Sequence, residues 1–267
     1  MSDSKQQLQD DLTSTLRSLG VVRGDVVMLH SDAIAVAQYR DLGNESGIHL
    51  FIDTLETYLG PEGTLLMPTF TYSLTKGHVY DVCKTASSVG MITEVFRRRP
   101  KTVRTHDPIF SFAISGAQKE RYRAADSVDC FGAGSVFDEL HRQNGWILWI
   151  GCALNTTFVH FVEKRVGVSY RYDKRFQGRR ILEDGREEPC ECVYYVRDLA
   201  RKTPANLKLL QTRLSGMGLL RAFDFARVRS WAVRSEDFLR CACTMLAEQE
   251  NSLIDEGVEA VVNSPSG

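Results

Sequence analysis

The chain has 267 residues, of which 43% are hydrophobic and 25% are charged, and its formal net charge is −1. This length suffices for one large domain or two small ones, and basic residues scattered singly, apart from three consecutive arginines at 97–99, exclude the basic stripe of a nucleic-acid-binding protein. The first thirty residues are unlike a signal peptide, no apolar run reaches the roughly 20 residues of a membrane span, and the seven cysteines fit reduced thiols. We therefore expect a cytoplasmic protein that binds neither membranes nor nucleic acid.

Helix and strand patterns alternate in the first part of the chain. Leucines at every fourth position predict an amphipathic helix over residues 5–18, and an apolar run predicts a strand at 25–29 that ends at the polar residues 30–32. Helical spacing over 48–59 precedes a second strand at 64–67. This order is typical of βαβ units, in which ligands gather where strands feed into loops.

The alternation continues through the middle of the chain. Residues 91–96 predict a helix closed by the arginine run, whose side chains we expect to be solvated at the helix end, and residues 109–114 predict a strand. A glycine-bearing segment at 131–135 then opens a helix that runs through Leu140. Its two glycines either serve backbone geometry or offer free N–H groups to an anion. Because the sequence lacks the P-loop and dinucleotide-binding motifs, nucleotide hydrolysis and hydride transfer lose support.

A polar cluster from Arg104 to Ser111 leads into the strand predicted at 109–114. Arg104 suits a bidentate contact with a phosphate, whereas the alternative for the cluster is a surface turn. The sequence contains neither the nucleophile elbow of serine hydrolases nor the H-E-x-x-H pattern of zinc proteases. Polar loops at strand ends therefore remain as candidate sites.

An imidazole and a carboxylate follow the apolar strand predicted at 147–151. Asn155 or Thr156 can cap a helix on which His160 and Glu163, three residues apart, share one face. The carboxylate can orient the ring and stabilise its protonated form, which is the arrangement of a general base. The alternative is a half-buried helix in which these two common residues merely bond to each other.

The last third of the chain predicts fewer elements. Residues 173–189 are polar, charged and glycine-bearing, and predict a long excursion rather than part of the core. A strand is predicted at 231–233, a final helix begins at 235–237, and the last dozen residues look frayed. The C-x-C pairs at 190 and 192 and at 241 and 243 could in principle hold a metal, but the second pair points to different sides of a helix, so we expect none.

Six of these clusters, in this order, resemble landmarks of the aminoglycoside 3-N-acetyltransferase family, also called the antibiotic N-acetyltransferases. The landmarks are His30-Ser31, 60–71, 85–97, 104–111, 131–135 and 155–163. The resemblance implies a three-layer α/β/α fold with a mixed central sheet. It also implies one N-acyltransferase domain over residues 1–258, followed by a flexible tail at 259–267. The implied activity is direct transfer of an acyl group from acetyl-CoA, or another acyl-CoA, to the amine of an amino sugar, without a metal.

The resemblance also implies roles for particular residues. His160 matches the catalytic base and Glu163 its partner, with Cys152 as a rival nucleophile. Contacts with the coenzyme fall to His30, Ser31, Ala33, Ile34, Ala35, Arg104, Ser111 and Phe112. Candidate contacts with the acceptor are Tyr72, His106, Asp107, Thr157, Arg171 and Lys174, and Thr157 or backbone N–H groups could stabilise the developing oxyanion.

Two departures from the family pattern bear on the acceptor. The drug-modifying members commonly carry a His-Pro where this chain has Asp107-Pro108, with a histidine one place earlier at His106. The basic segment 170–180 looks closer to relatives from polysaccharide biosynthesis, and its Arg171, Lys174 and Arg175 would suit the diphosphate of a nucleotide-linked amino sugar. We therefore expect such an acceptor. An aminoglycoside drug is the alternative, a non-catalytic CoA-binding scaffold is the second alternative, and a homodimer is left open.

Overall fold

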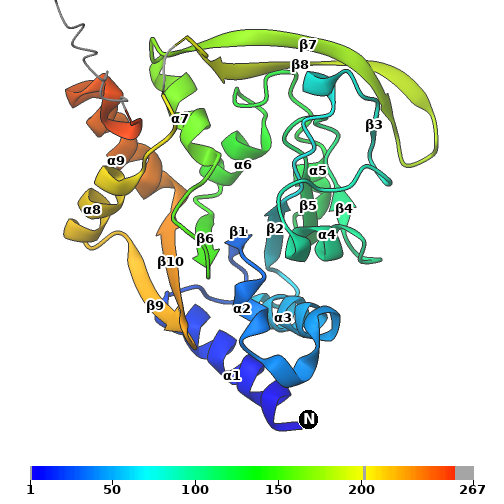
Figure 1. Ribbon diagram of the computed structural model, residues 1–267, viewed down its shortest axis with the longest axis vertical. Coiled ribbons are helices and arrows are strands. Elements are labelled where there is room, and N and C mark those ends of the chain that lie inside the picture. Colours follow the sequence, from blue (N-terminus) through cyan, green and yellow to red (C-terminus); the bar gives the residue numbers. More distant parts are fainter. Residues whose placement is uncertain (1, 201–202, 256–267) are drawn as a thin grey trace, which may run out of the picture.

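A seven-stranded mixed sheet runs through the computed structural model, which describes residues 2–200 and 203–255 (Figure 1). Its strand order is β4-β5-β2-β1-β6-β10-β9. The three central strands are parallel: β2 (Thr64–Pro68), β1 (Val26–Ser31) and β6 (Trp146–Ile150). The antiparallel strands at the two sides are β4 (Val103–Arg104), β5 (Phe112–Gly116), β9 (Arg221–Phe225) and β10 (Val228–Arg234). The parallel centre brings the carboxyl ends of β1, β2 and β6 to one edge.

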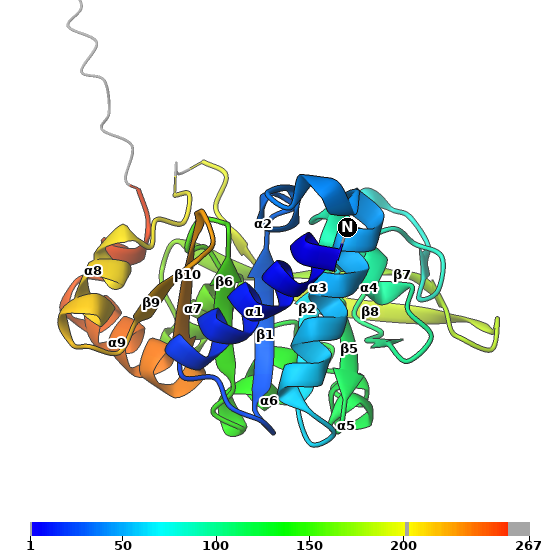
Figure 2. The ribbon, with the colours of Figure 1, turned by 90° about the horizontal axis from the view of Figure 1, so that it is seen from below.

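Four helices cover one face of this sheet (Figure 2). They are α1 (Ser2–Ser18), α2 (Ile34–Ala37), α3 (Asn44–Leu59) and α4 (Met91–Arg97). The predicted leucine stripe of α1 is fully buried against the sheet, since Leu8, Leu12 and Leu16 have no exposed surface. Burial of one apolar stripe explains why periodicity alone located this helix.

The other face carries a second group of helices and a core rich in aromatic side chains. The helices are α5 (Lys119–Arg123), α6 (Val136–Arg142), α7 (Phe158–Val166), α8 (Lys208–Gly216) and α9 (Ser235–Glu248). Ser135 caps α6, because its hydroxyl accepts the backbone N–H of Asp138 at 3.2 Å. The two helical layers and the mixed sheet confirm the predicted α/β/α architecture.

A long two-stranded ribbon arches over the sheet from α7 to β3 (Figure 1). It consists of β7 (Arg171–Ile181) and β8 (Glu187–Arg197), which pair along their whole length, and β3 (Tyr80–Asp81) joins the end of β7. The predicted excursion at 173–189 lies largely outside the core, as expected, but it is a regular pair of strands rather than a loop. Most side chains of β7 are exposed, and ion pairs such as Arg175 with Glu191 bridge its two strands, so its polarity concealed a regular ladder.

Smaller differences also appear along the chain. Neither α8 nor β9 was predicted, and short 3-10 turns lie at Arg40–Leu42, Leu74–Lys76 and Glu250–Leu253. The predicted tail at 259–267 lies outside the described residues. No helix of the described part of the chain is both long and apolar enough to span a membrane.

The expectation of a solvated arginine run holds for only one of its three members. Arg98 is largely exposed, with 66% of its side-chain surface accessible. In contrast, the side chain of Arg97 is 4% exposed and forms an ion pair with Glu94 at 2.6 Å. Arg99 pairs with Asp53 and Glu56 on α3. Two of these cations therefore anchor α4 within the fold rather than face water.

Candidate functional site

A cleft of about 520 Å³ opens at the carboxyl ends of the three parallel strands. The end of β1 contributes His30 and Ser31, and the segment after β2 contributes Phe70 and Tyr72. The loop after β6 and the start of α7 contribute residues from Cys152 to His160. Ligands of open α/β sheets bind at this edge, so the sheet topology itself marks the cleft as the candidate active site.

The pair predicted from the sequence lies at this cleft, on α7. His160 lines the cleft with 17% of its side chain exposed, and Glu163 lies fully buried behind it. The two side chains meet at 2.6 Å between Nδ1 of the imidazole and Oε2 of the carboxylate. Because the carboxylate accepts, Nδ1 carries the hydrogen, and Nε2 is left as the ring nitrogen able to receive a proton from a ligand.

Two residues that follow α7 complete the surroundings of Glu163. The hydroxyl of Tyr170 donates to Oε1 at 3.0 Å, and Nε of Arg171 forms an ion pair with Oε2 at 2.6 Å. Arg171 was predicted to contact the acceptor, but its side chain is 4% exposed and it also donates to the carbonyl of Tyr195 at 3.2 Å. Its guanidinium therefore lies inside the protein, against the carboxylate.

Electrostatics favour a neutral His160. Burial lowers the pKa of His160 below its usual value, Glu163 offsets part of this effect, and Arg171 adds to it. A histidine whose pKa is lowered stays unprotonated at neutral pH and can act as a base there. The geometry and the protonation state of His160 thus both fit the role of a general base.

His30 is a second neutral imidazole at the cleft. Its Nε2 lies 3.0 Å from Oγ1 of Thr156, which also accepts the backbone N–H of Phe158 at 3.2 Å. Burial lowers the pKa of His30 to about 4. The neighbouring Oγ of Ser31 is buried and has no hydrogen-bond partner within the described part of the chain.

The remaining coenzyme candidates after β1 lie beside this cleft. Ala33, Ile34 and Ala35 begin the short helix α2, where Asp32 accepts the backbone N–H of Ile34 at 2.9 Å. Ile34 is 53% exposed and Ala35 is fully buried. None of the three belongs to the described lining of the cleft.

Tyr72 occupies an uncommon backbone conformation at the cleft wall. Its φ of 56° lies in the left-handed region, where residues other than glycine are rare and which costs of the order of 1 kcal/mol or more. Burial, with a contribution from Tyr194, raises the pKa of Tyr72 to about 12, so its phenol remains a hydrogen-bond donor at neutral pH. The fold thus maintains local strain to hold a donor in the cleft.

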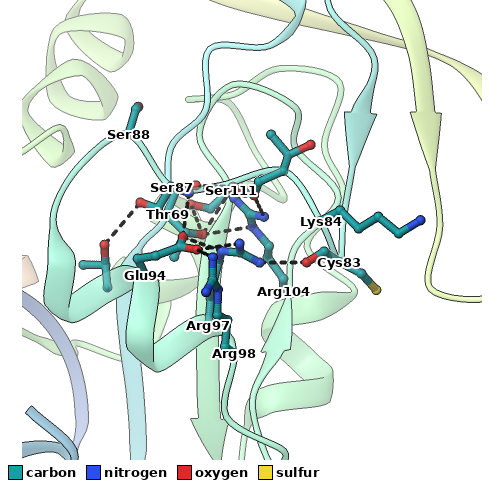
Figure 3. Close-up of polar contacts among 12 residues, drawn as sticks. Thr69, Cys83, Lys84, Ser87, Ser88, Glu94, Arg97, Arg98, Arg104 and Ser111 are labelled. Atoms are coloured by element: carbon teal, nitrogen blue, oxygen red, sulfur yellow. Dashed lines mark hydrogen bonds and ion pairs between the residues drawn. The ribbon is translucent and has the colours of Figure 1, made fainter. Parts of the chain in front are cut away.

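Arg104 lies in a buried polar cluster beside the cleft rather than in it (Figure 3). Its guanidinium donates to the hydroxyls of Thr69 and Ser111, each at 3.2 Å, and to the carbonyl of Thr69 at 2.7 Å. Further bonds reach the carbonyls of Val82 at 3.2 Å and Thr85 at 2.6 Å. These contacts tie the loop after β3 to the ends of β2 and β5.

That loop and the start of α4 each contribute one residue to the cleft. Ser88 donates from both its backbone N–H and its hydroxyl to the carbonyl of Phe70, at 2.9 and 2.8 Å. Val89 and Thr93, which come next, line the cleft. Phe112, another coenzyme candidate, is fully buried in the core. In this arrangement, Arg104 and Ser111 shape the cleft wall from behind.

The acceptor candidates do not all converge. Tyr72 and Thr157 line the cleft, whereas His106 pairs with Glu183 at 3.1 Å and Lys174 lies over the ring of Phe176. Asp107 accepts two backbone N–H groups of its own turn and borders a second cavity, of about 580 Å³, beneath the ribbon. Sequence reasoning assigned no role to Phe70, Val89 or Leu207, whose apolar side chains carry no chemical signal.

Cysteine chemistry finds little support at the cleft. Burial raises the pKa of Cys152 to about 11, which keeps its thiol protonated at neutral pH and weakens it as a rival nucleophile. All seven cysteines are free thiols. Across residues 2–200 and 203–255, no group of three or more His, Cys, Asp or Glu is placed to hold a metal ion.

Comparison with known proteins identifies relatives of the chain. Residues 28–247 match the family model described as aminoglycoside 3-N-acetyltransferase. The chain is 28% identical over 180 residues to aminoglycoside N(3)-acetyltransferase IV of Salmonella sp, covering 66% of this chain and 65% of the relative. It is 23% identical over 183 residues to the SPbeta prophage-derived aminoglycoside N(3')-acetyltransferase-like protein YokD of Bacillus subtilis strain 168, covering 59% of this chain and 65% of the relative. The matches thus span just under two thirds of these curated relatives.

Solved structures share the fold over most of the chain. The apoenzyme of aminoglycoside acetyltransferase AAC(3)-IVa has a TM-score of 0.71 at 24% identity, covering 91% of this chain and 89% of that chain. AAC(3)-Xa gives 0.76 at 20% identity, covering 92% and 96%. AAC-IIIb in a binary complex with CoASH gives 0.74 at 21% identity, covering 90% and 96%. These likenesses confirm the predicted fold.

Proposed function

Since the chain belongs to the aminoglycoside 3-N-acetyltransferase family, we propose that it transfers an acetyl group from acetyl-CoA to the 3-amino group of an aminoglycoside. The observation that carries the proposal is the short contact between His160 Nδ1 and the buried Glu163, placed at the cleft. Support comes from the curated relatives, one named aminoglycoside N(3)-acetyltransferase IV and the other an aminoglycoside N(3')-acetyltransferase-like protein. Fold neighbours include structures with CoASH, with a gentamicin and with apramycin.

The cleft suits a thioester. The side chains that line it are largely apolar, such as Phe70, Val89 and Leu207, with hydroxyl groups between them. We place the acyl end of the coenzyme against His30 and Ser31, with Ala33, Ile34 and Ala35 alongside. The buried Oγ of Ser31, which lacks a partner within the described chain, is a donor left for the coenzyme. Arg104, Ser111 and Phe112 act indirectly, by holding the cleft wall.

The proposed reaction needs a base. An amine is mostly protonated at neutral pH, and its nitrogen attacks only after losing a proton. The ammonium first releases one proton to solvent, and Nε2 of His160 takes the second proton from the neutral amine while the new C–N bond forms at the thioester carbonyl and the C–S bond breaks. The imidazolium returns that proton to the departing sulfur, so the products are an amide and a free thiol. Glu163 favours the transient imidazolium, and Tyr72 and Thr157 are candidate donors to the oxyanion.

Release of free thiol tests the proposal directly. The purified protein is mixed with acetyl-CoA and gentamicin-type or kanamycin-type acceptors, and thiol is followed over time. We expect release that depends on the acceptor, and loss of at least about a thousandfold in the variant His160→Ala. His141→Gln, on α6 and away from the cleft, is the matched control. An absence of release with every acceptor, together with no CoA binding, would reject the proposal.

A second acceptor class is favoured by one observation. No carboxylate occurs among the described side chains that line the cleft, although a polycationic drug prefers acidic surroundings. The nearby Asp129 and Asp173 are both paired with Lys164, at 2.6 and 2.5 Å. We therefore propose, as the alternative, an amino sugar with a single amine.

The basic segment adds little to the case for a nucleotide-linked sugar. Arg171 and Arg175 are already paired with Glu163 and Glu191, which leaves Lys174 as the remaining cation of the three. Rates with glucosamine, an amino-nucleotide-sugar and gentamicin, compared at equal concentration, discriminate the acceptors. Preference for gentamicin would exclude the single-amine alternative.

A further inference from the structure

The proposed base, His160, belongs to a cluster of four interacting side chains centred on Glu163. Oε2 of Glu163 meets both Nδ1 of His160 and Nε of Arg171, each at 2.6 Å, and Oε1 accepts the hydroxyl of Tyr170 at 3.0 Å. Glu163 has no exposed surface, and the side chain of Arg171 is 4% exposed. Both carboxylate oxygens are therefore fully used inside the protein.

We propose that Arg171 is a positioning residue of the catalytic pair: it fixes Glu163 Oε2 against His160 Nδ1 and connects the base to the β7–β8 ribbon. This inference rests on the function proposed above. It assigns Arg171 a role different from the acceptor contact expected from the sequence, because the guanidinium lies outside the described cleft lining and its burial leaves it no access to a ligand.

The physical need for this residue follows from burial of charge. An ionised carboxylate without exposed surface is costly unless a cation and hydrogen bonds compensate it. Arg171 supplies the cation, so the pair with Glu163 carries no net charge next to the imidazole. Without Arg171, the uncompensated carboxylate would raise the pKa of His160 and lower the fraction of unprotonated base near neutral pH.

The charged groups around His160 agree with this balance. Within the described chain, Glu163 raises the pKa of His160 and Arg171 lowers it. The phenols of Tyr170 and Tyr194 have pKa values raised by burial and stay neutral at physiological pH. His30, across the cleft, is neutral as well, because burial lowers its pKa to about 4. Arg171 is thus the cation that offsets Glu163.

Arg171 also links the β7–β8 ribbon to the segment that follows α7. It is the first residue of β7, pairs in register with Arg197 of β8, and donates to the carbonyl of Tyr195 at 3.2 Å. Tyr195 in turn donates its hydroxyl to the carbonyl of Val168, which follows α7, at 2.8 Å. The ribbon is thereby attached to the same short connection that carries Tyr170.

The test measures the pKa of His160 directly. The variant Arg171→Met keeps an apolar stem but removes the charge, and the C2 proton of His160 is followed by NMR against pH, assigned with His160→Ala. We expect the pKa of His160 to rise by about one unit, because a neighbouring cation has been lost. An unchanged or lowered pKa would overturn the proposal. This readout needs no turnover, so it stands apart from the proposed function.

Kinetics provide the second readout. In Arg171→Met, the acid limb of kcat/KM should move upward by the same amount, activity should recover at pH values above the shifted limb, and KM for the acceptor should change less than about threefold. A raised KM with an unmoved pH profile would instead indicate direct acceptor contact. Arg179→Met, on the exposed part of β7, is the control and should match the parent protein. If Arg171→Met does not fold, Arg171→Lys should fold and keep a near-parental pH profile; a shifted profile there also counts against the proposal.

Discussion

The imidazole of His30 stacks on the indole of Trp149, with ring centroids 5.8 Å apart and planes inclined by 20°. His30 is the penultimate residue of β1 and Trp149 lies opposite it in β6, so this contact joins the two central strands at the cleft. The indole N–H also donates to the carbonyl of Asn155 at 2.7 Å, which fixes the loop leading to α7. This aromatic pair therefore supports both the end of β1 and the loop that leads to His160 on α7.

The burial of His30 predicts a pH dependence of stability. Its folded pKa of about 4 lies below the unfolded value of 6.5, so the unfolded chain binds more protons between these limits. Stability should therefore fall as pH decreases from 6.5 towards 4, by up to about 3 kcal/mol from this residue. In His30→Gln this part of the slope should vanish. Urea unfolding at pH 4.5, 5.5 and 7 measures it, and an identical slope in both proteins would contradict the prediction.

Glu163→Gln should act on the base in the direction opposite to Arg171→Met. Loss of the carboxylate removes the group that raises the pKa of His160, so the acid limb of kcat/KM should move to lower pH. Because the transient imidazolium loses its partner, kcat should fall by about 10- to 100-fold. The buried cation Arg171 is left uncompensated, which should cost about 3–5 kcal/mol of stability.

Kinetic pH profiles and urea titrations measure both effects. Glu187→Gln, which breaks an exposed ion pair with Arg179 on the ribbon, is the matched control. It should leave the acid limb of kcat/KM in place and change the free energy of unfolding by no more than about 1 kcal/mol. An acid limb that moves upward in Glu163→Gln would disprove the assigned role of the carboxylate.

Periodic burial made much of the fold predictable. The helices α1 and α3 each bury one apolar side, and the short central strands β2 and β6 are buried along their whole length and mostly apolar, so their spacing in the sequence reports their surroundings. The ribbon was missed for the same reason, because most of β7 buries no face and its regularity comes from pairing with β8. Local pattern shows which residues are buried, not which strand lies alongside.

In the candidate site, too, local contacts could be predicted from the sequence and long-range contacts could not. His160 and Glu163 interact within one helical turn, so spacing alone placed them together. Arg104 and Arg171 looked like ligand contacts because a sequence shows a charge and not its burial. The partners of Arg104 come from the residue after β2, the residue before β5 and the loop after β3, and only the tertiary fold brings these segments around one guanidinium.

Because the hydrogen-bond donors of Arg104 are used within the protein, its replacement should lower the stability of the fold. In Arg104→Met, the carbonyl of Thr85 loses its donor and that of Thr69 keeps only the hydroxyl of Ser111, so unfolding stability should drop by about 3 kcal/mol or more. KM for acetyl-CoA should rise at the same time, because the loop that carries Val89 loosens. Arg98→Met, a change at the exposed neighbour in the same region, should alter neither property. A stable Arg104→Met protein with a raised KM would point instead to direct coenzyme contact.

The strained backbone at Tyr72 predicts a role for its hydroxyl. If the phenol donates to the oxyanion, Tyr72→Phe should lower kcat by roughly 10-fold or more while KM for acetyl-CoA stays within about twofold, because the bond strengthens only in the transition state. Above the acid limb set by His160, the parent rate should show no fall due to this phenol below about pH 11, since the phenol titrates only near its pKa of about 12. Stability should change little, because no hydrogen bond from this hydroxyl occurs within the described residues. Tyr172→Phe, at an exposed tyrosine of β7, is the matched control. Equal kcat values for the two variants would remove Tyr72 from the proposed mechanism and leave Thr157 as its candidate donor.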